Sequence, residues 1–302
     1  SLTGVAREVA ALAGKTAQFV EVPEVPATID AKRDIVLDAP EACPLYCGRV
    51  IRGVNAKAPT PEWMKRRLER SGIRAISALV DVTNYVMLEL GQPLHAFDNT
   101  HLEGAIHARM AKPGEKLLLL NEQTIPLETD VLMIADDAKP VAMAGIMGGE
   151  ESGITLETTE LLLEAAFFAP KAIAGRARRY SFVSDASHRF ERGVDFGGTR
   201  RAMERATRLI LDICGGEAGP VVEAKAALPQ RNPVRLRTAR AARVLGVALP
   251  AEAIADLFRR LGLTFRREGD DFLVTPPSYR FDIEIEEDLI EEIARLHGYD
   301  NI

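Results

Sequence analysis

Residues 81–98, DVTNYVMLELGQPLHAFD, predict a short helix that passes through a tight turn into an extended segment. Asp81 is a typical helix N-cap, and Gly91 followed by Pro93 is typical of a helix end. The apolar face of this helix has i and i+4 spacing, and its members are Val82, Val86 and Leu90. We expect the rest of the chain to be organised around this helix, turn and extended segment.

Three polar side chains of this stretch form a candidate ligand site. Thr83 and Asn84 are predicted in the first turn of the helix, where backbone N–H groups are unpaired and the helix dipole is positive. His95 follows the turn and can face away from the core. Such groups suit a ligand with a carbonyl or anionic group, although a capped helix and a satisfied histidine would give the same pattern.

Length and composition limit the classes of protein to consider. The 302 residues are enough for about two domains with a real core. The formal net charge of −6 argues against nucleic-acid binding over the whole surface but allows a local basic patch. The three cysteines form no paired framework or metal-like cluster, which favours reduced thiols in a cytoplasmic protein. There is no signal peptide and no apolar run long enough to cross a membrane, and the start at Ser1 suggests a piece of a longer chain.

A strand is expected over 46–52, followed by a helix that Thr60 caps and Gly72 ends. Residues 105–168 show the period of β-strands, with short apolar runs separated by turn residues. Residues 161–168 predict a buried strand that carries one carboxylate, Glu164. An ionised carboxylate in a core costs several kcal/mol, so Glu164 needs either a structural ion pair or a ligand. The glycine-rich loop 145–153 permits close approach of a ligand to the backbone, but an ordinary turn would look the same.

Residues 170–195 carry six basic and three acidic side chains, a local excess of positive charge in an acidic chain. This excess suggests a surface that faces phosphate, and a solvated charged face is the alternative. Asp185 is predicted to cap a helix that extends to Arg192. A longer helix is expected over 198–213.

After Pro220 the pattern restarts as two helices and a hairpin, which resemble a winged-helix arrangement. The last helix carries acidic side chains at i, i+3 and i+4, and another acid lies just upstream: these four are Asp282, Asp288, Glu291 and Glu292. Carboxylates so placed repel one another unless cations lie between them, which suits Mg2+. An acidic helix start stabilised by the helix dipole is the alternative.

Five motifs stand in the order found in one known family, the β subunit of bacterial phenylalanyl-tRNA synthetase, which this chain resembles over nearly its whole length. The motifs are residues 52–54, 81–98, 143–149, 186–195 and 288–292. The resemblance implies an α+β fold: a mixed β-sheet editing domain with flanking helices over 47–220, followed by a small winged-helix-like α/β domain over 228–302. Residues 1–46 are similar to the end of a preceding domain and a linker.

The resemblance also implies an activity, because a site for phenylalanine cannot strongly reject tyrosine, which only adds a hydroxyl. The family hydrolyses mischarged tyrosyl-tRNA(Phe) at a second site, by water attack on the ester. Glu164 matches the residue that meets the tyrosine hydroxyl, and three others match residues that line the pocket: Gly148, Ser184 and Ala186. Thr83, Asn84 and His95 match residues near the ester and the terminal adenosine. Many members have Thr at position 184, so the detailed shape of the pocket is open.

The family further implies partners and a metal ion. These are the α subunit in a heterotetramer of two α and two β subunits, tRNA(Phe), tyrosine or phenylalanine, and Mg2+ shared with the α subunit through Asp282, Asp288, Glu291 and Glu292. No membrane contact is expected. The alternative function is a non-catalytic scaffold that docks tRNA and forms a subunit interface in the same synthetase. DNA binding by the winged-helix-like part is disfavoured by its acidic last helix.

Overall fold

Two adjacent strands with apolar side chains on both faces organise residues 21–228. In the computed structural model, which describes residues 1–302, β2 (Leu45–Arg52) and β10 (Glu160–Phe167) pair antiparallel along their whole length. Both strands are buried on their two faces, which explains their nearly continuous apolar sequence. The strands predicted at these positions are confirmed.

The central sheet has the order β11-β2-β10-β3, and β12 also pairs with β2. Its other strands are β3 (Leu94–Asp98), β11 (Glu217–Ala218) and β12 (Val222–Lys225). Alternate side chains enter two different cores, because successive residues of a strand point to opposite faces. Tyr46, Val50, Leu162 and Ala166 enter one core, and Ile51, Leu161, Leu163 and Ala165 enter the other.

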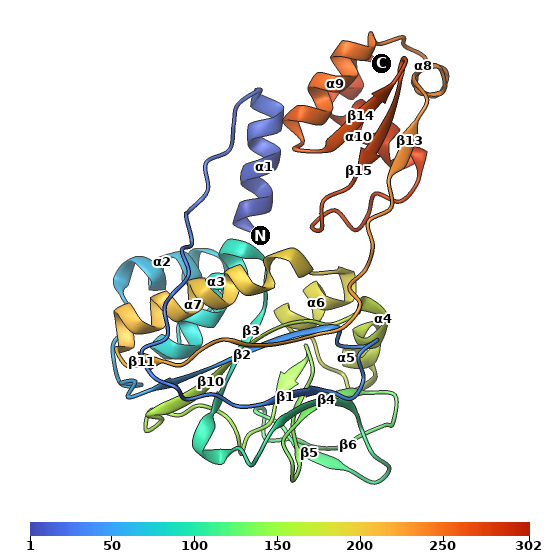
Figure 1. Ribbon diagram of the computed structural model, residues 1–302. Coiled ribbons are helices and arrows are strands. Elements are labelled where there is room, and N and C mark those ends of the chain that lie inside the picture. The colour runs from blue at the N-terminus through green and yellow to red at the C-terminus, as the bar shows by residue number, and fades with distance from the viewer. The chain divides into compact units, whose positions relative to one another are not determined.

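Helices cover one face of this sheet. They are α2 (Glu62–Arg70), α3 (Ala78–Leu90) and α7 (Thr199–Cys214), which Figure 1 shows on the same side of β2 and β10. The helix α7 was predicted over 198–213. Of the five apolar residues that the sequence indicates for its packing face, Met203, Ala206, Leu209 and Ile210 are buried and Ile213 is half-buried. Gly91 ends α3 with φ of +87°, as the sequence predicted.

Two predicted helix caps are wrong. Helix α3 begins at Ala78, so Asp81 lies inside it. The buried Asp81 carboxylate accepts hydrogen bonds from the backbone N–H of Ile76 (2.8 Å) and from the hydroxyl of Thr60 (2.5 Å). Thr60 therefore supports the start of α3 rather than capping α2, which begins after Pro61 without a side-chain cap.

A second sheet, of order β1-β4-β7-β8-β9, shares the core on the other face. Its strands are β1 (Ile35–Leu37), β4 (Ile106–Met110), β7 (Leu132–Ala135), β8 (Pro140–Met143) and β9 (Met147–Gly148), next to the hairpin β5 (Lys116–Leu118) and β6 (Thr124–Pro126). Short helical segments complete the unit: η1 (Asn99–His101), α4 (Pro170–Ile173), α5 (Arg176–Arg179), α6 (Asp185–Arg192) and η2 (Phe196–Gly198). The predicted change to strand periodicity after residue 105 is confirmed.

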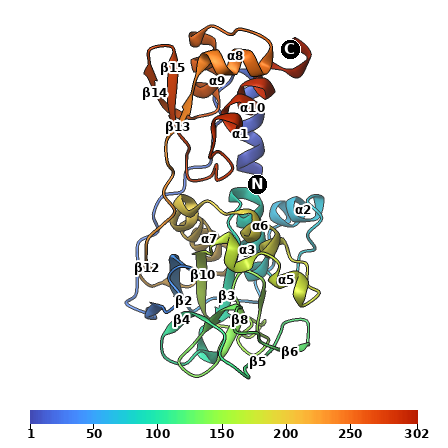
Figure 2. The same ribbon diagram turned by 90° about the vertical axis from the view of Figure 1, so that its right-hand side faces the viewer.

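Residues 1–20 and 229–302 form a separate unit (Figure 2). Its sheet has the order β13-β15-β14, and its strands are β13 (Val234–Leu236), β14 (Thr264–Glu268) and β15 (Asp271–Thr275). Its helices are α1 (Leu2–Ala13), α8 (Thr238–Leu245), α9 (Ala251–Arg260) and α10 (Glu286–His297), with the short η3 (Tyr299–Asn301) at the end. The predicted order of two helices followed by a hairpin is confirmed, and the fold is α+β.

The helix α1 leaves most of its apolar face exposed. Its apolar positions Val5, Val9 and Leu12 are about 60% exposed, and Ala11 is the residue that enters the core of this unit. The segment 1–46 is thus divided between the two units. All three cysteines are buried and free, and none of the helices is both long and apolar enough to span a bilayer.

Candidate functional site

The sheet register brings two ionisable side chains together. Glu164 on β10 lies directly opposite His95 on β3 and Gly48 on β2. Side chains at these positions point away from helices α3 and α7, because their neighbours Leu161, Leu163 and Ala165 face those helices. The segments that provide His95 and Glu164 are separated by more than sixty residues, so only the folded sheet makes them neighbours.

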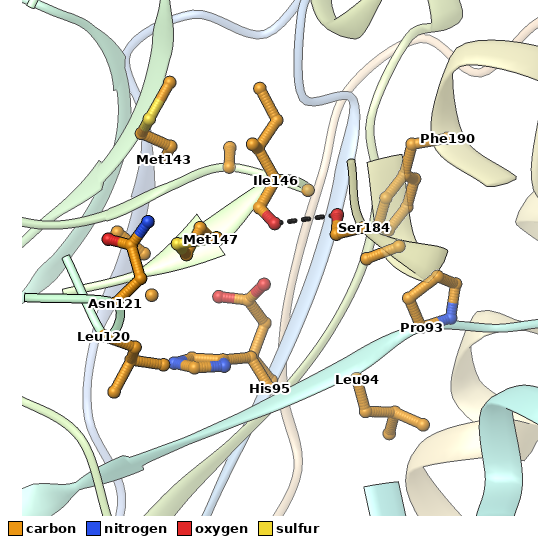
Figure 3. Close-up of a pocket in the computed structure, with 16 residues that line it drawn as sticks. Pro93, Leu94, His95, Leu120, Asn121, Met143, Ile146, Met147, Ser184 and Phe190 are labelled. Atoms are coloured by element: carbon orange, nitrogen blue, oxygen red, sulfur yellow. Dashed lines mark hydrogen bonds between the residues drawn. The ribbon is translucent and has the colours of Figure 1, made fainter. Parts of the chain in front are cut away.

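A cavity of about 370 Å3 lies at this place, between the central sheet, β8, β9 and α6 (Figure 3). Its polar lining residues are His95, Asn121, Glu164 and Ser184. Its apolar lining comes from residues 93–94, Leu120, residues 142–148, Ala186 and Phe190. An apolar cavity of this size with a few converging polar groups is typical of a small-molecule site, for which roughly 300–1,000 Å3 is usual.

Glu164 is 6% exposed and forms no salt bridge. The hydroxyl of Tyr46 donates a hydrogen bond of 2.7 Å to its Oε2 atom. Burial raises the pKa of Glu164 to about 7, although the bond from Tyr46 acts in the opposite direction. The structural ion pair considered from the sequence is therefore absent, and the carboxylate lines a cavity.

His95 is held in a neutral state in the same cavity. Its ring packs edge-to-face on Phe97 with 4.4 Å between centroids, and burial lowers its pKa to about 4. Its Nε2 atom is buried without a hydrogen-bond partner. Gly148 leaves the space that this ring needs, since a Cβ atom at position 148 would lie 2.6 Å from Cε1 of His95.

Helix α6 forms one wall of the cavity through Ala186 and Phe190, which are one turn apart. Ser184, not Asp185, is the N-cap of this helix, so that part of the prediction is wrong. The Ser184 hydroxyl accepts from the backbone N–H of Ser187 and donates to the carbonyl of Ile146, at 3.0 and 2.9 Å. The hydroxyl hydrogen of Ser184 is thus used in a hydrogen bond that connects α6 to the loop before β9.

Thr83 and Asn84 do not line this cavity. Because α3 begins at Ala78, both residues lie beyond its first turn, and the expected position beside unpaired backbone N–H groups is wrong. The Thr83 hydroxyl donates to the carbonyl of Val80 at 2.8 Å. Helix α3 packs on the face of the central sheet opposite to that of Glu164, so sequence proximity to His95 did not translate into a shared cavity.

Two of the four carboxylates predicted to bind Mg2+ contact arginines instead. Arg280 contacts both Asp282 (2.7 Å) and the buried Glu292 (2.9 Å), and Arg295 also contacts Glu292. Asp288 accepts backbone N–H groups at the start of α10. Glu291 is exposed. No group of three or more His, Cys, Asp or Glu side chains is arranged to hold a metal ion, so the residues as placed here do not fit Mg2+.

Acidic partners occupy most of the basic side chains of residues 170–195. Arg176 and Arg179 both contact Asp130, and the helix α6 arginines pair within the helix, Arg189 with Asp185 and Arg192 with Glu191. These pairs are exposed and contribute little to stability. A phosphate-facing surface here stays a prediction.

Comparison with known families agrees with this architecture. The family described as "B3/4 domain" matches residues 42–215, which include β2, β3, β10, α6 and every residue that lines the cavity. The chain belongs to the B3/4 domain family. A second family, described as "tRNA synthetase B5 domain", matches residues 234–299.

Similar proteins carry one name. The chain is 78% identical to the phenylalanine–tRNA ligase β subunit of Dechloromonas aromatica and 67% identical to that of Aromatoleum aromaticum, in each case over all of this chain and 38% of the relative. A solved N-terminal fragment of the phenylalanyl-tRNA synthetase β subunit of Pyrococcus horikoshii is 14% identical, with a TM-score of 0.45, over 99% of this chain and 83% of that chain. The predicted resemblance to the synthetase β subunit is confirmed.

The B3/4 domain contains site residues that sequence reasoning missed. Tyr46 was assigned only to a strand, and Asn121 only to the turn after a strand. A tyrosine on a buried strand needs a partner for its hydroxyl, which is a usable signal. The pairing of β2 with β10, which makes Glu164 that partner, comes from residues more than a hundred positions apart and has no local signature.

Proposed function

We propose that this chain carries the editing site of a phenylalanine–tRNA ligase β subunit and hydrolyses the ester bond of tyrosyl-tRNA(Phe). The observation that carries the proposal is the buried Glu164, which has no cation beside it and lines an apolar cavity together with Ala186. A phenol hydroxyl that enters the cavity can donate to the Oε1 atom of Glu164. The ring would lie in the space left by the small side chain of Ala186.

This chemistry gives a physical basis for selectivity between tyrosine and phenylalanine. An apolar pocket discriminates against an added hydroxyl by only about a hundredfold, so a second site has to recognise the hydroxyl itself. Phenylalanine in the same cavity would leave the Glu164 carboxylate desolvated and without its ligand hydrogen bond. That loss costs roughly 1–3 kcal/mol or more for a charged group, which favours the tyrosyl ester.

The reaction needs no covalent intermediate, because an aminoacyl ester is already activated. The chain has to position the ester and a water molecule and to stabilise the oxyanion. His95 is neutral and has a free Nε2 atom in the cavity, so it can hydrogen-bond to the ester or to the attacking water. Thr83 and Asn84 stay proposed contacts of the ester and the terminal adenosine, from a position outside the cavity.

The direct test is release of tyrosine from tyrosyl-tRNA(Phe) by the 302-residue chain. Glu164→Ala and Ala186→Trp should each lower the rate at least about a hundredfold, the first by removing the acceptor and the second by filling the cavity. Glu160→Ala is the matched control, because Glu160 lies on the same strand but pairs with Arg52 outside the cavity. Hydrolysis that is unchanged in both cavity variants would contradict the proposal.

The alternative is a scaffold that docks tRNA and forms a subunit interface without chemistry of its own. It is favoured by the fact that the chain spans only 38% of the length of the relatives it matches. The two functions differ in one measurement: a scaffold binds tRNA(Phe) but releases tyrosine no faster than buffer does.

Partners follow from the proposed membership of a phenylalanine–tRNA ligase. We infer an α subunit, tRNA(Phe) and a cytoplasmic location for the assembled enzyme. Mg2+ shared with the α subunit also stays a prediction. For that site, Arg280 stands between Asp282 and Glu292, and the four carboxylates predicted as ligands are not grouped.

A further inference from the structure

We propose that Tyr46 is a positioning residue for the cavity: its hydroxyl holds Oε2 of Glu164 and keeps this carboxylate as an acceptor for one ligand hydroxyl. The inference rests on the proposed function, since it concerns how the same site recognises tyrosine. None of the residues that the sequence assigned to the pocket performs this role.

Tyr46 and Glu164 are arranged so that the direction of their hydrogen bond is fixed. Tyr46 is fully buried on β2, and the only hydrogen-bond partner of its hydroxyl is Oε2 of Glu164, at 2.7 Å. A phenol has a single proton to donate, and an ionised carboxylate can only accept. The bond therefore leaves Oε1 as the oxygen that can receive a second hydroxyl from the cavity.

No other group around Glu164 stabilises its ionised form. On β3 the facing titratable side chain is the neutral His95, and before β2 it is the buried thiol of Cys43. On α6 the titratable residue between the lining residues Ser184 and Ala186 is Asp185, which is paired with Arg189 at the surface. Tyr46 is thus the one neighbour that stabilises the ionised form, against a burial penalty that favours the protonated form.

Removal of the Tyr46 hydroxyl should change the charge state of Glu164 without changing the shape of the cavity wall. Tyr46→Phe keeps the ring and removes the donor, so the carboxyl binds its proton more tightly. A protonated Glu164 can donate as well as accept a hydrogen bond. It therefore no longer prefers a ligand that donates a hydroxyl proton. Hydrolysis of tyrosyl-tRNA(Phe) should fall about tenfold near neutral pH, a usual effect of losing a hydrogen bond to a charged group.

The pH profile separates this role from simple packing. In Tyr46→Phe the acid limb of the rate profile should move to higher pH by about one unit, so that activity recovers in alkaline buffer. Replacing Tyr46 with 3,5-difluorotyrosine, a stronger donor of the same shape, should move the limb to lower pH. Carbon NMR of the Glu164 carboxyl should report the same two shifts in its titration without any substrate.

Tyr85→Phe is the matched control, because Tyr85 also donates to a buried glutamate, Glu89 (2.9 Å), but on the helical side of the sheet. It should leave the profile of tyrosyl-tRNA(Phe) hydrolysis in place. If Glu164→Ala abolishes hydrolysis while the Tyr46→Phe profile superimposes on that of Tyr85→Phe, the role of Tyr46 is wrong and the proposed function stands. If Glu164→Ala has no effect on hydrolysis, both proposals are wrong.

Discussion

Glu164 and Glu292 have the same exposure but opposite surroundings. Each is a glutamate that is 6% exposed in the core of its own unit. Glu292 lies between Arg280 and Arg295, and although burial alone would raise its pKa, the hydrogen bonds from these arginines lower it. Glu164 has only the hydroxyl of Tyr46, and burial raises its pKa to about 7.

The difference indicates which buried acid is available for a ligand. The charge of Glu292 is already compensated inside the protein, so a metal ion would have to displace an arginine to reach it. Glu164 is only partly compensated, and it borders a cavity in which its second oxygen can accept a hydrogen bond. A buried carboxylate thus indicates a binding site when it has no cation as a partner and lies beside a cavity.

Removing the cation from the compensated acid should have the largest effect on stability. Arg280→Ala leaves Glu292 buried with a single partner and should destabilise the unit of α10 by about 3 kcal/mol, a usual result of breaking a buried ion pair. Hydrogen exchange of the α10 amides measures this locally, which suits a chain with two units. Arg235→Ala, which breaks the exposed pair with Asp271 in the same unit, is the control. Equal exchange in the two variants would mean that Glu292 does not depend on Arg280.

Replacing the uncompensated acid should instead stabilise the fold at high pH. The folded pKa of Glu164, about 7, lies above its ordinary value of 4.5. The folded state therefore binds the proton more tightly, and the native protein loses stability as pH rises from about 4.5 to 7. This loss is about 3 kcal/mol at ~1.4 kcal/mol for each pKa unit. Glu164→Gln should abolish it.

Fluorescence of Trp63 measures this effect, because the chain has one tryptophan and it lies in the unit of Glu164. The free energy of unfolding of Glu164→Gln should equal that of the native chain below about pH 4.5 and exceed it at pH 8. Glu160→Gln, on the same strand but paired with the exposed Arg52, should show no such divergence. A constant difference between Glu164→Gln and the native chain across pH would place the titration of Glu164 outside this range.

Local patterns in the sequence were sufficient for most elements of the fold. Strands β2 and β10 and helix α7 end within about a residue of their predicted limits, because apolar periodicity and turn residues define them. Helix starts were less predictable. Asp81 is acidic at the start of an apolar period, yet its carboxylate accepts from Ile76 and Thr60, which precede the helix.

The candidate site was predictable where a single residue was chemically unusual for its position in the sequence. Glu164 in an apolar strand was such a residue, and the structure buries it beside a cavity. Tyr46 was not predictable, because its importance depends on a strand pairing. Asp282 and Glu292 show another limit of sequence patterns: their repulsion was recognised from the sequence, but the cation between them in the structure is Arg280 of the chain itself.

A third set of acidic residues, Asp38 and Asp137, is paired with a histidine, which can lose its charge. We expect the smallest effect on stability here. His107 on β4 contacts Asp38 through Nδ1 (2.7 Å) and Asp137 through Nε2 (2.9 Å). Burial alone would lower the pKa of His107, but these two hydrogen bonds raise it. The folded state therefore favours the charged ring, and its stabilising effect is complete below the ordinary pKa of 6.5 and is lost as pH rises through the folded value.

His107→Gln should remove this dependence while it keeps a hydrogen-bonding side chain between Asp38 and Asp137. The variant should be less stable than the native chain at pH 5.5 and equally stable at pH 9. The loss of stability at pH 5.5 should be smaller than the effects of Arg280→Ala and Glu164→Gln, because solvent screens these exposed groups. Raising the salt concentration should shrink the difference at pH 5.5 further, whereas the effect of Glu164→Gln comes from burial and should persist in salt. A His107→Gln difference that grows with pH would mean that His107 is held neutral, as His95 is.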